Sequence, residues 1–185
     1  MKRIGYIYEN IYTHKNLKEA IKMASKGKKD RKQVKYVLEH MDACIENIQQ
    51  MLKSRTYRPS QMRKKTIVDG ISKKQRTIFV PKFYPDQIIQ WAVLLQIQPI
   101  LTKGMSDFTC ASIPGRGIHY GKRFVERWLR SDRKHTKYCL KLDVHHFYPS
   151  INHDCLKFML RRKFKDKKLL DLLDAIIDSE NGLPI

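Results

Sequence analysis

The residues with the clearest chemical potential lie in the stretch KYCLKLDVHHFYPSI, at positions 137–151. Apolar side chains at every second position from Tyr138 to Val144 are typical of a buried strand, and Asp143 falls near its end. A carboxylate on a buried strand is costly unless it is paired or holds a cation. Asp143 is therefore a candidate Mg²⁺ ligand, because Mg²⁺ binds through one or two carboxylates together with substrate phosphates. A helix cap or a salt bridge to a nearby lysine is the structural alternative.

The histidines that follow Asp143 raise the question of a zinc site. His145 and His146, with the sequence His153-Asp154-Cys155 further on, carry nitrogen and sulfur donors. Structural zinc sites use four ligands at regular short spacings, and none of those patterns occurs in this sequence. Zinc is the weaker reading, and we expect His153 and Asp154 to begin a helix.

The charge of the chain indicates a polyanionic partner. Its 185 residues include 38 Lys and Arg against 18 Asp and Glu, a formal net charge of +20. Nucleic acid is the first candidate, because neutralising phosphates releases condensed counterions. A membrane surface is less favoured, since no basic amphipathic helix with a clean apolar face stands out. A basic surface that is simply solvated is the remaining alternative.

Cysteine usage and hydropathy bear on the compartment. The four cysteines are widely spaced and form no Cys-x-x-Cys pair, which is typical of reduced thiols in a cytoplasmic protein. No apolar stretch is long enough to span a bilayer, and MKRIGYIYEN at the N-terminus lacks the apolar core of a signal peptide.

The pattern of apolar residues predicts an α+β, helix-rich chain. Helices are expected at 16–26, 30–53, 86–98, 119–131, 153–163 and 166–178. The first should stop at Gly27, Asp86 should cap the third, and Phe124, Val125, Trp128 and Leu129 of the fourth should face inward. Residues 62–68 and 76–80 form a candidate hairpin around the turn pair Asp69-Gly70. The strand at 138–144 stands alone in this reading, so another strand must pair with it.

Three segments together resemble reverse transcriptases. DVHHFYPSI resembles motif A of that family, in which a metal-binding Asp precedes paired aromatic residues and Ser-Ile. Upstream, KKQRTIFVPKFYPDQIIQWAVLLQIQPIL resembles the fingers segment, and GLPI at 182–185 looks like the opening of motif B. Order and spacing agree from about Tyr57 to the last residue. The most similar members are bacterial non-LTR enzymes: group II intron maturases, retrons and diversity-generating retroelement polymerases.

The resemblance implies a role for each matching residue at a deoxynucleotide site. Asp143 would ligate both catalytic Mg²⁺ ions, and the backbone carbonyl of Val144 would help to bind one of them. Tyr148 would select dNTP over NTP by excluding a 2′-hydroxyl, with Phe147 packed in the core beside it. Three cations of the hairpin would bind the triphosphate of the incoming nucleotide: Lys73, Lys74 and Arg76. The role suits Arg76 because a guanidinium group binds phosphate oxygens bidentately. Lysines on an exposed turn are equally typical of a solvated loop.

The loop SIPGRG lies where the family places a template-contacting segment. Ala111, Ser112 and Ile113 replace the Gly-Phe-Arg found in many members, whereas Gly115 and Arg116 match. Glycine lets backbone approach a phosphate closely. Gly115 and Arg116 are therefore the expected template contacts, and a plain turn between two helices is the alternative.

These features predict the fingers and the start of the palm of a right-hand polymerase. The regions would be a helical part at 1–58, the fingers at 59–137 and the beginning of the palm at 138–185. The sequence has no Asp-Asp dipeptide, which the family places after motif B, so we expect this chain to be inactive alone. The partners of the complete enzyme would be an RNA template, a DNA or RNA primer and dNTP.

Two other functions fit part of the pattern. A non-catalytic basic RNA-binding module could keep a polymerase-like scaffold. A polymerase that makes RNA, or one that needs no template, is also conceivable, but Tyr148 disfavours ribonucleotide incorporation.

Overall fold

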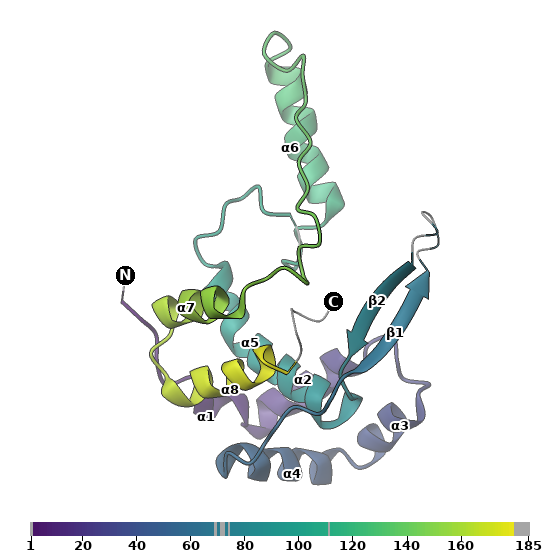
Figure 1. The fold of residues 1–185 in the computed structure, drawn as a ribbon, viewed down its shortest axis with the longest axis vertical. Helices are drawn as coiled ribbons and strands as arrows, with labels where there is room; N and C mark the ends of the chain where they lie inside the picture. Colours follow the sequence, from purple (N-terminus) through teal and green to yellow (C-terminus); the bar gives the residue numbers. More distant parts are fainter. Residues whose placement is uncertain (1, 69, 71–72, 74, 111, 180–185) are drawn as a thin grey trace. The chain divides into compact units, whose positions relative to one another are not determined.

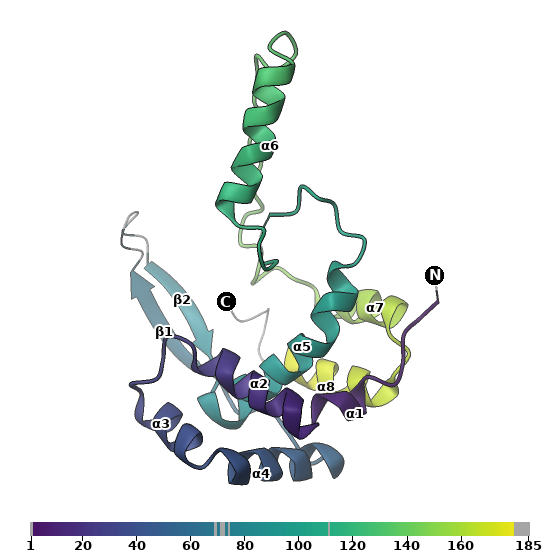
Figure 2. The same ribbon diagram turned by 180° about the vertical axis from the view of Figure 1, so that it is seen from behind.

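The computed structural model describes residues 2–68, 70, 73, 75–110 and 112–179 (Figures 1 and 2). The chain divides into two compact units. Unit 1 comprises Met1–Ile97 and His146–Ile185, and unit 2 comprises Gln98–His145. None of the helices in the described ranges has the length and apolar content needed to cross a membrane.

Four N-terminal helices build much of the unit 1 core. They are α1 (Tyr8–Ile11), α2 (His14–Ser25), α3 (Lys32–Glu39) and α4 (Met41–Lys53). The Thr13 side chain caps α2 by accepting a hydrogen bond from the Asn16 N–H, which satisfies one otherwise unpaired donor. The apolar face predicted for α2 is buried, and α2 packs against α4. The helix at 16–26 is thus present, with Gly27 at a positive φ of 71° just after its end.

The single helix predicted at 30–53 is wrong, because it is two helices separated at His40. His40 has φ −115° and ψ 40°, outside helical geometry, while its backbone N–H still bonds to the Tyr36 carbonyl. The His40 ring stacks on the Tyr36 ring with 4.4 Å between centroids. The apolar period continues through the break, which explains why the sequence pattern concealed it.

The predicted hairpin is present as the antiparallel pair β1 (Arg63–Val68) and β2 (Gln75–Val80). Arg63 lies opposite Val80, and Lys65 lies opposite Ile78. Since successive side chains of a strand point to opposite faces, these four residues share one face of the hairpin. This register places two cations and two aliphatic side chains together.

The chain continues through a short helical turn, η1 (Phe83–Gln87), into α5 (Ile88–Thr102). The prediction that Asp86 caps this helix is wrong. Its buried carboxylate instead accepts hydrogen bonds from the Tyr57 hydroxyl (2.9 Å) and the Ser60 N–H (3.4 Å). Burial, with Asp86 alongside, raises the pKa of Tyr57. Asp86 therefore ties the segment that follows α4 to the start of α5.

Two C-terminal helices complete unit 1: α7 (His153–Lys163) and α8 (Lys167–Ile177), as the sequence predicts. The segment before α1 joins them, since the Ile4 N–H bonds to the Lys163 carbonyl at 2.9 Å and the Lys165 N–H to the Ile4 carbonyl at 2.8 Å. Phe164, between these two bonds, is fully buried. The two ends of the described chain are thus held together.

Unit 2 contains the end of α5 and α6 (Ile118–Ser131), close to the helix predicted at 119–131. The prediction that its apolar side chains face inward is largely wrong, because α6 has no buried residue and Val125, Trp128 and Leu129 are about half exposed. An aromatic cluster joins Phe108 to Phe124 and Trp128, with ring centroids 5.1 and 5.0 Å from that of Phe108.

The strand predicted at 138–144 is not formed, which corrects the fold expected from the sequence. These residues have no regular secondary structure, and their apolar side chains are exposed, up to 95% at Tyr138. A strand needs a neighbour to pair its backbone groups. In the described ranges the sheet consists of β1 and β2 alone, so the alternating pattern has nothing to cover it.

Candidate nucleic-acid interface

The largest basic concavity of unit 1 among the described pockets lies beside the hairpin, and we name it the hairpin groove. It has a volume of about 770 Å³. Its cationic lining residues are Lys28, Arg31, Arg63 and Lys65. The rest of the lining is aliphatic, aromatic or amide: Ile78, Phe79, Val80, Pro81, Gln87, Gln90, Trp91 and Leu94.

Two separate parts of the chain supply the four cations. Arg63 and Lys65 come from the face of β1 that also carries Ile78 and Val80 of β2. Lys28 and Arg31 come from the loop between α2 and α3, which passes beside the hairpin in both views (Figures 1 and 2). The sequence KGKKDRK at 26–32 concentrates charge in this loop.

Two hydrogen bonds of one glutamine, Gln87, fix the loop to the base of the hairpin. Lys28 Nζ donates to Gln87 Oε1 at 2.8 Å, and Gln87 Nε2 donates to the Pro81 carbonyl at 2.9 Å. Gln87 thus accepts from the loop and donates to the residue that follows β2. These contacts position the loop beside the hairpin, and they bring no carboxylate to the groove cations within the described residues.

The electrostatics of the groove favour an anion. No Asp or Glu occurs among its described lining residues. Burial lowers the pKa of Lys28, and the positive charge of Arg31 lowers it further. A phosphate in the groove would reverse this penalty, since an opposite charge favours the charged form.

Trp91 adds a surface on which a base could stack. It lies on α5, in the first turns after η1, and is partly buried. Phe79 also contributes to the lining, although strand alternation places it on the opposite face of β2 from Ile78 and Val80. Single-stranded nucleic acids bind where a basic groove tracks the backbone and aromatic rings stack on bases.

The predicted triphosphate clamp lies at the far end of the same hairpin. Lys73 is exposed with a positive φ of 51°, and Arg76 lies on β2 opposite Ile67. Lys74 lies outside the described residues. The hairpin therefore carries the predicted nucleotide contacts near its turn. Two of the groove cations, Arg63 and Lys65, lie nearer its base.

Asp143 and Val144 lie in unit 2 and are exposed. Asp143 Oδ1 accepts a hydrogen bond from the Val144 N–H at 3.0 Å. Among the described residues no group of three His, Cys, Asp or Glu could hold a metal ion. The described residues thus offer Asp143 as one carboxylate and do not by themselves fit a two-metal site.

Tyr148 lies in unit 1, in a turn that precedes α7. Its ring meets that of Phe147 edge to face, with centroids 5.2 Å apart. Phe147 is half exposed, so it does not pack in a core. His153 begins α7 as expected, and its Nδ1 lies 3.2 Å from Asp178 Oδ1.

Gly115 and Arg116, the predicted template contacts, lie in unit 2. Gly115 has a positive φ of 78°, which suits glycine. Arg116 Nη2 lies 3.2 Å from Asp107 Oδ1, and Arg116 Nη1 donates to the Ser106 carbonyl at 3.1 Å. Its guanidinium also lies over the Tyr120 ring. A template phosphate at Arg116 must therefore compete with Asp107.

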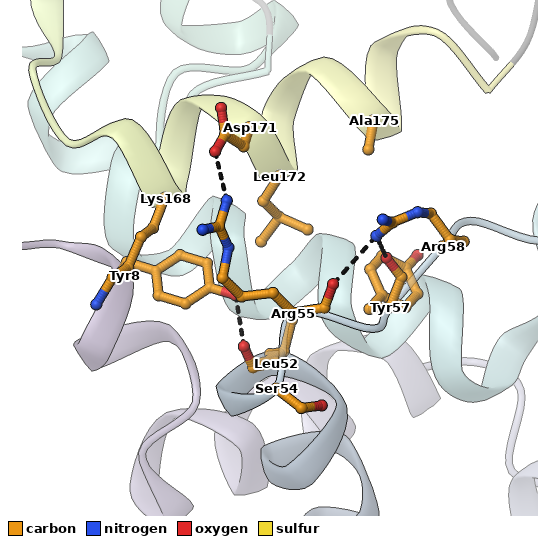
Figure 3. A pocket seen from close by; sticks show the side chains of 10 residues that line it. All are labelled: Tyr8, Leu52, Ser54, Arg55, Tyr57, Arg58, Lys168, Asp171, Leu172 and Ala175. Atoms are coloured by element: carbon orange, nitrogen blue, oxygen red, sulfur yellow. Dashed lines mark hydrogen bonds and ion pairs between the residues drawn. The ribbon is translucent and has the colours of Figure 1, made fainter.

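A second pocket, of about 480 Å³, lies between the end of α4 and α8 (Figure 3). Protein groups engage each of its cations. Arg55 Nη2 lies 2.6 Å from Asp171 Oδ2, and Lys168 Nζ lies 2.8 Å from Glu9 Oε1. Arg58 Nη1 donates to the carbonyls of Arg55 and Tyr57. This pocket therefore joins α4 and α8 through ion pairs, whereas among the described residues no cation of the hairpin groove pairs with a carboxylate.

Sequence reasoning missed the groove residues Lys28, Arg31 and Trp91. The signal for the two cations was the basic run 26–32, immediately after a helix. Trp91 was hidden in an apolar helix where it reads as core. Only the tertiary structure shows that the loop, the hairpin and α5 meet.

Comparisons with known proteins identify two relatives of this chain. No family model matches the chain. The chain is similar to Group II intron-encoded protein LtrA from Lactococcus lactis subsp. cremoris and from its strain MG1363, with 29% identity over 129 residues in each case. The matched segment covers 70% of this chain and 21% of each relative, so it spans about a fifth of the curated relatives' length. This distant similarity supports a relation to group II intron-encoded proteins.

Proposed function

We propose that this chain is the fingers region and the beginning of the palm of an RNA-directed DNA polymerase of a retroelement. One structural observation carries the proposal: the hairpin that bears Lys73 and Arg76 also forms one wall of a basic groove with a tryptophan. A templated polymerase needs a nucleotide site next to a nucleic-acid track. The similarity to a group II intron-encoded protein supports the same assignment.

In this proposal the hairpin groove holds single-stranded template. Its cations hold phosphates, and Trp91 stacks on a base. Arg76 and the lysines near the turn hold the triphosphate of an incoming dNTP, because Arg forms paired hydrogen bonds to phosphate oxygens. Tyr148 discriminates against the ribose 2′-hydroxyl. Arg116 exchanges Asp107 for a template phosphate.

Mg²⁺ is the proposed cofactor of the complete enzyme. When bound, Mg²⁺ stabilises negative charge on transferring phosphoryl groups. Asp143 is the proposed ligand in this chain, with Val144 contributing its carbonyl. The other carboxylates must come from outside the described residues.

Primer extension by a longer polypeptide that contains this chain tests the proposal. Asp143→Asn should lower extension on an RNA template by roughly two orders of magnitude or more while leaving RNA affinity unchanged. Asp30→Asn, at an exposed carboxylate in the basic loop, is the matched control and should extend normally. Tyr148→Ala should extend with reduced dNTP-over-NTP selectivity. Normal extension by the Asp143 variant would contradict the assignment.

A non-catalytic RNA-binding module is the second candidate. The observation in its favour is that the described residues complete a groove but offer a single carboxylate for metal. It predicts full RNA binding with no extension by the longer polypeptide under any condition. The 185-residue chain alone should bind RNA under either proposal, and extension by this chain alone would contradict both.

A further inference from the structure

A second basic surface of unit 1 lies where the N-terminal segment meets the end of α7. We name it the α7 patch, and a concavity of about 630 Å³ marks it. Its lining residues are Arg3, Met159, Arg161, Arg162 and Lys163. It lies on the opposite side of unit 1 from the hairpin in both views (Figures 1 and 2).

Backbone hydrogen bonds set the position of Arg3 relative to α7. The Ile4 N–H and carbonyl bond to Lys163 and Lys165, and buried Phe164 anchors this junction. Arg3 thus directly precedes a residue whose backbone is fixed against the helix end. The patch is assembled from two distant parts of the sequence and is more than the basic last turn that often complements a helix dipole.

Most of the charge on the patch is uncompensated. Arg161 pairs with Asp174 of α8 through two hydrogen bonds. Arg3, Arg162 and Lys163 make no ion pair with any described residue, and no Asp or Glu occurs among the described residues that line the concavity. Three cations therefore converge without a carboxylate to neutralise them.

Exposed apolar side chains lie beside these cations. Phe158 and Met159 of α7 are each 63% exposed. Phe158 precedes Arg162 by four residues, and Met159 precedes Lys163 by four, so each pair shares a helix face. A ring next to a cation suits a nucleotide, whose base can stack while its phosphate is neutralised.

We propose that the α7 patch is a second RNA-binding surface, distinct from the hairpin groove. The inference rests on the proposed nucleic-acid role of the chain, since it assigns the same class of partner to another face. Charge complementarity selects the polyanion, and Phe158 favours a single-stranded segment. The chain would then hold two RNA segments at once.

Stoichiometry with a short oligonucleotide tests the proposal. The probe is a single-stranded RNA of about ten nucleotides, within the range of single-strand binding sites. Native mass spectrometry and fluorescence anisotropy should show two RNAs per chain. The triple variant Arg3→Gln, Arg162→Gln, Lys163→Gln should bind one, with the second event weakened by roughly tenfold or more and the salt dependence flattened by about 0.7 per lost phosphate contact.

Matched variants make the outcome specific. A control triple variant removes the same charge from exposed helical lysines of unit 1 and should still bind two RNAs. It carries Lys15→Gln, Lys18→Gln and Lys35→Gln. A groove triple variant removes three of the positive charges that line the hairpin groove and should leave RNA binding at the α7 patch intact. It carries Lys28→Gln, Arg31→Gln and Arg63→Gln. Phe158→Leu should weaken the α7 event alone, and circular dichroism should show that every variant is folded.

Any of three results would overturn the α7 patch: RNA binding that the α7 triple variant leaves unchanged, two RNAs on that variant, or an equal loss in the lysine control. Displacement of the second RNA by polyglutamate of equal charge would also overturn it, because the patch would then take any polyanion. A groove variant that still binds two RNAs would contradict the groove assignment under Proposed function and leave the α7 patch standing. The two proposals therefore fail separately.

Discussion

The two units of this chain differ in what surrounds their apolar residues. In unit 1, the apolar faces of α2, α4, α5 and α8 are buried, and many of their side chains are fully buried. In unit 2, α6 has apolar side chains at helical spacing but no buried residue, and residues 138–144 alternate with no pairing strand among the described residues. Periodicity therefore predicts which face of an element is apolar, and that face is buried only where a second layer of structure packs on it.

The difference between the units has a direct energetic meaning. Apolar burial stabilises in proportion to the area removed from water, about 25 cal/mol per Å². Unit 1 gains this stabilisation from side chains that belong to elements far apart in sequence. The described part of unit 2 gains it mainly from the aromatic cluster of Phe108, Phe124 and Trp128. Unit 1 should therefore determine the stability of the chain.

The largest expected effect compares the same substitution in the two units. Leu17→Ala, at a fully buried position in α2, should lower the free energy of unfolding by about 2–5 kcal/mol, because it leaves a cavity in a packed core. Leu142→Ala, at a position that is 81% exposed, should change it by less than about 0.5 kcal/mol. Urea unfolding followed by circular dichroism measures both. Equal losses would show that residues 138–144 are covered in solution and would remove the contrast between the units.

Local features of the fold could be predicted from the sequence, and tertiary ones could not. The helix at 16–26 and the two strands of the hairpin follow from periodicity, and both are present, whereas Asp69 of the predicted turn lies outside the described residues. The break at His40 leaves the apolar period intact, so no local signal marked it. The role of Asp86 depends on the Tyr57 hydroxyl, 29 residues earlier in the chain. Contacts of that kind do not appear in a local pattern.

The candidate site follows the same division. Lys73 and Arg76 could be placed on a hairpin because the hairpin itself is a local structure. The hairpin groove needs Lys28 and Trp91 to approach that hairpin from other elements, which the sequence does not encode in any window. The roles of Asp143 and Tyr148 stay predictions from the family resemblance. The placement of a residue on a local element could thus be predicted, whereas contacts that depend on tertiary packing could not.

A smaller expected effect concerns the carboxylate that joins the ends of unit 1. Burial tends to raise the pKa of Asp166, but backbone hydrogen bonds from Tyr8, Ile7 and Leu169 outweigh it and hold the pKa below the usual range. Because the folded-state pKa is lowered, this contribution to stability is present above the unfolded-state pKa of about 3.9 and is lost as pH falls through the folded-state value.

Asp166→Asn should therefore destabilise the chain by about 1 kcal/mol at pH 7, because the amide cannot accept all of these bonds. The loss relative to wild type should shrink as pH falls below about 4, where Asp166 is protonated first in the unfolded chain, and should be smallest below the folded-state pKa. Urea unfolding at a series of pH values measures this difference. A destabilisation that is constant across the series would show that the charge of Asp166 is irrelevant to α1 and α8. Asp30→Asn, at an exposed position, is the control.

The smallest expected effect tests whether unit 2 has a core of its own. Phe108→Leu removes the ring that meets Phe124 and Trp128 edge to face, and aromatic pairs of this kind contribute about 0.5–1.5 kcal/mol beyond burial.

The two tryptophans separate the units, since Trp91 lies in unit 1 and Trp128 in unit 2. In a Trp91→Phe background, fluorescence therefore follows unit 2 alone, and Ile118→Val at an exposed position is the control. In that background, Phe108→Leu should lower the free energy of unfolding reported by Trp128 by about 0.5 kcal/mol. In a Trp128→Phe background, the free energy of unfolding reported by Trp91 should not change. A loss as large as that of Leu17→Ala would mean that the aromatic cluster is a packed core, and the two units would then differ in size rather than in kind.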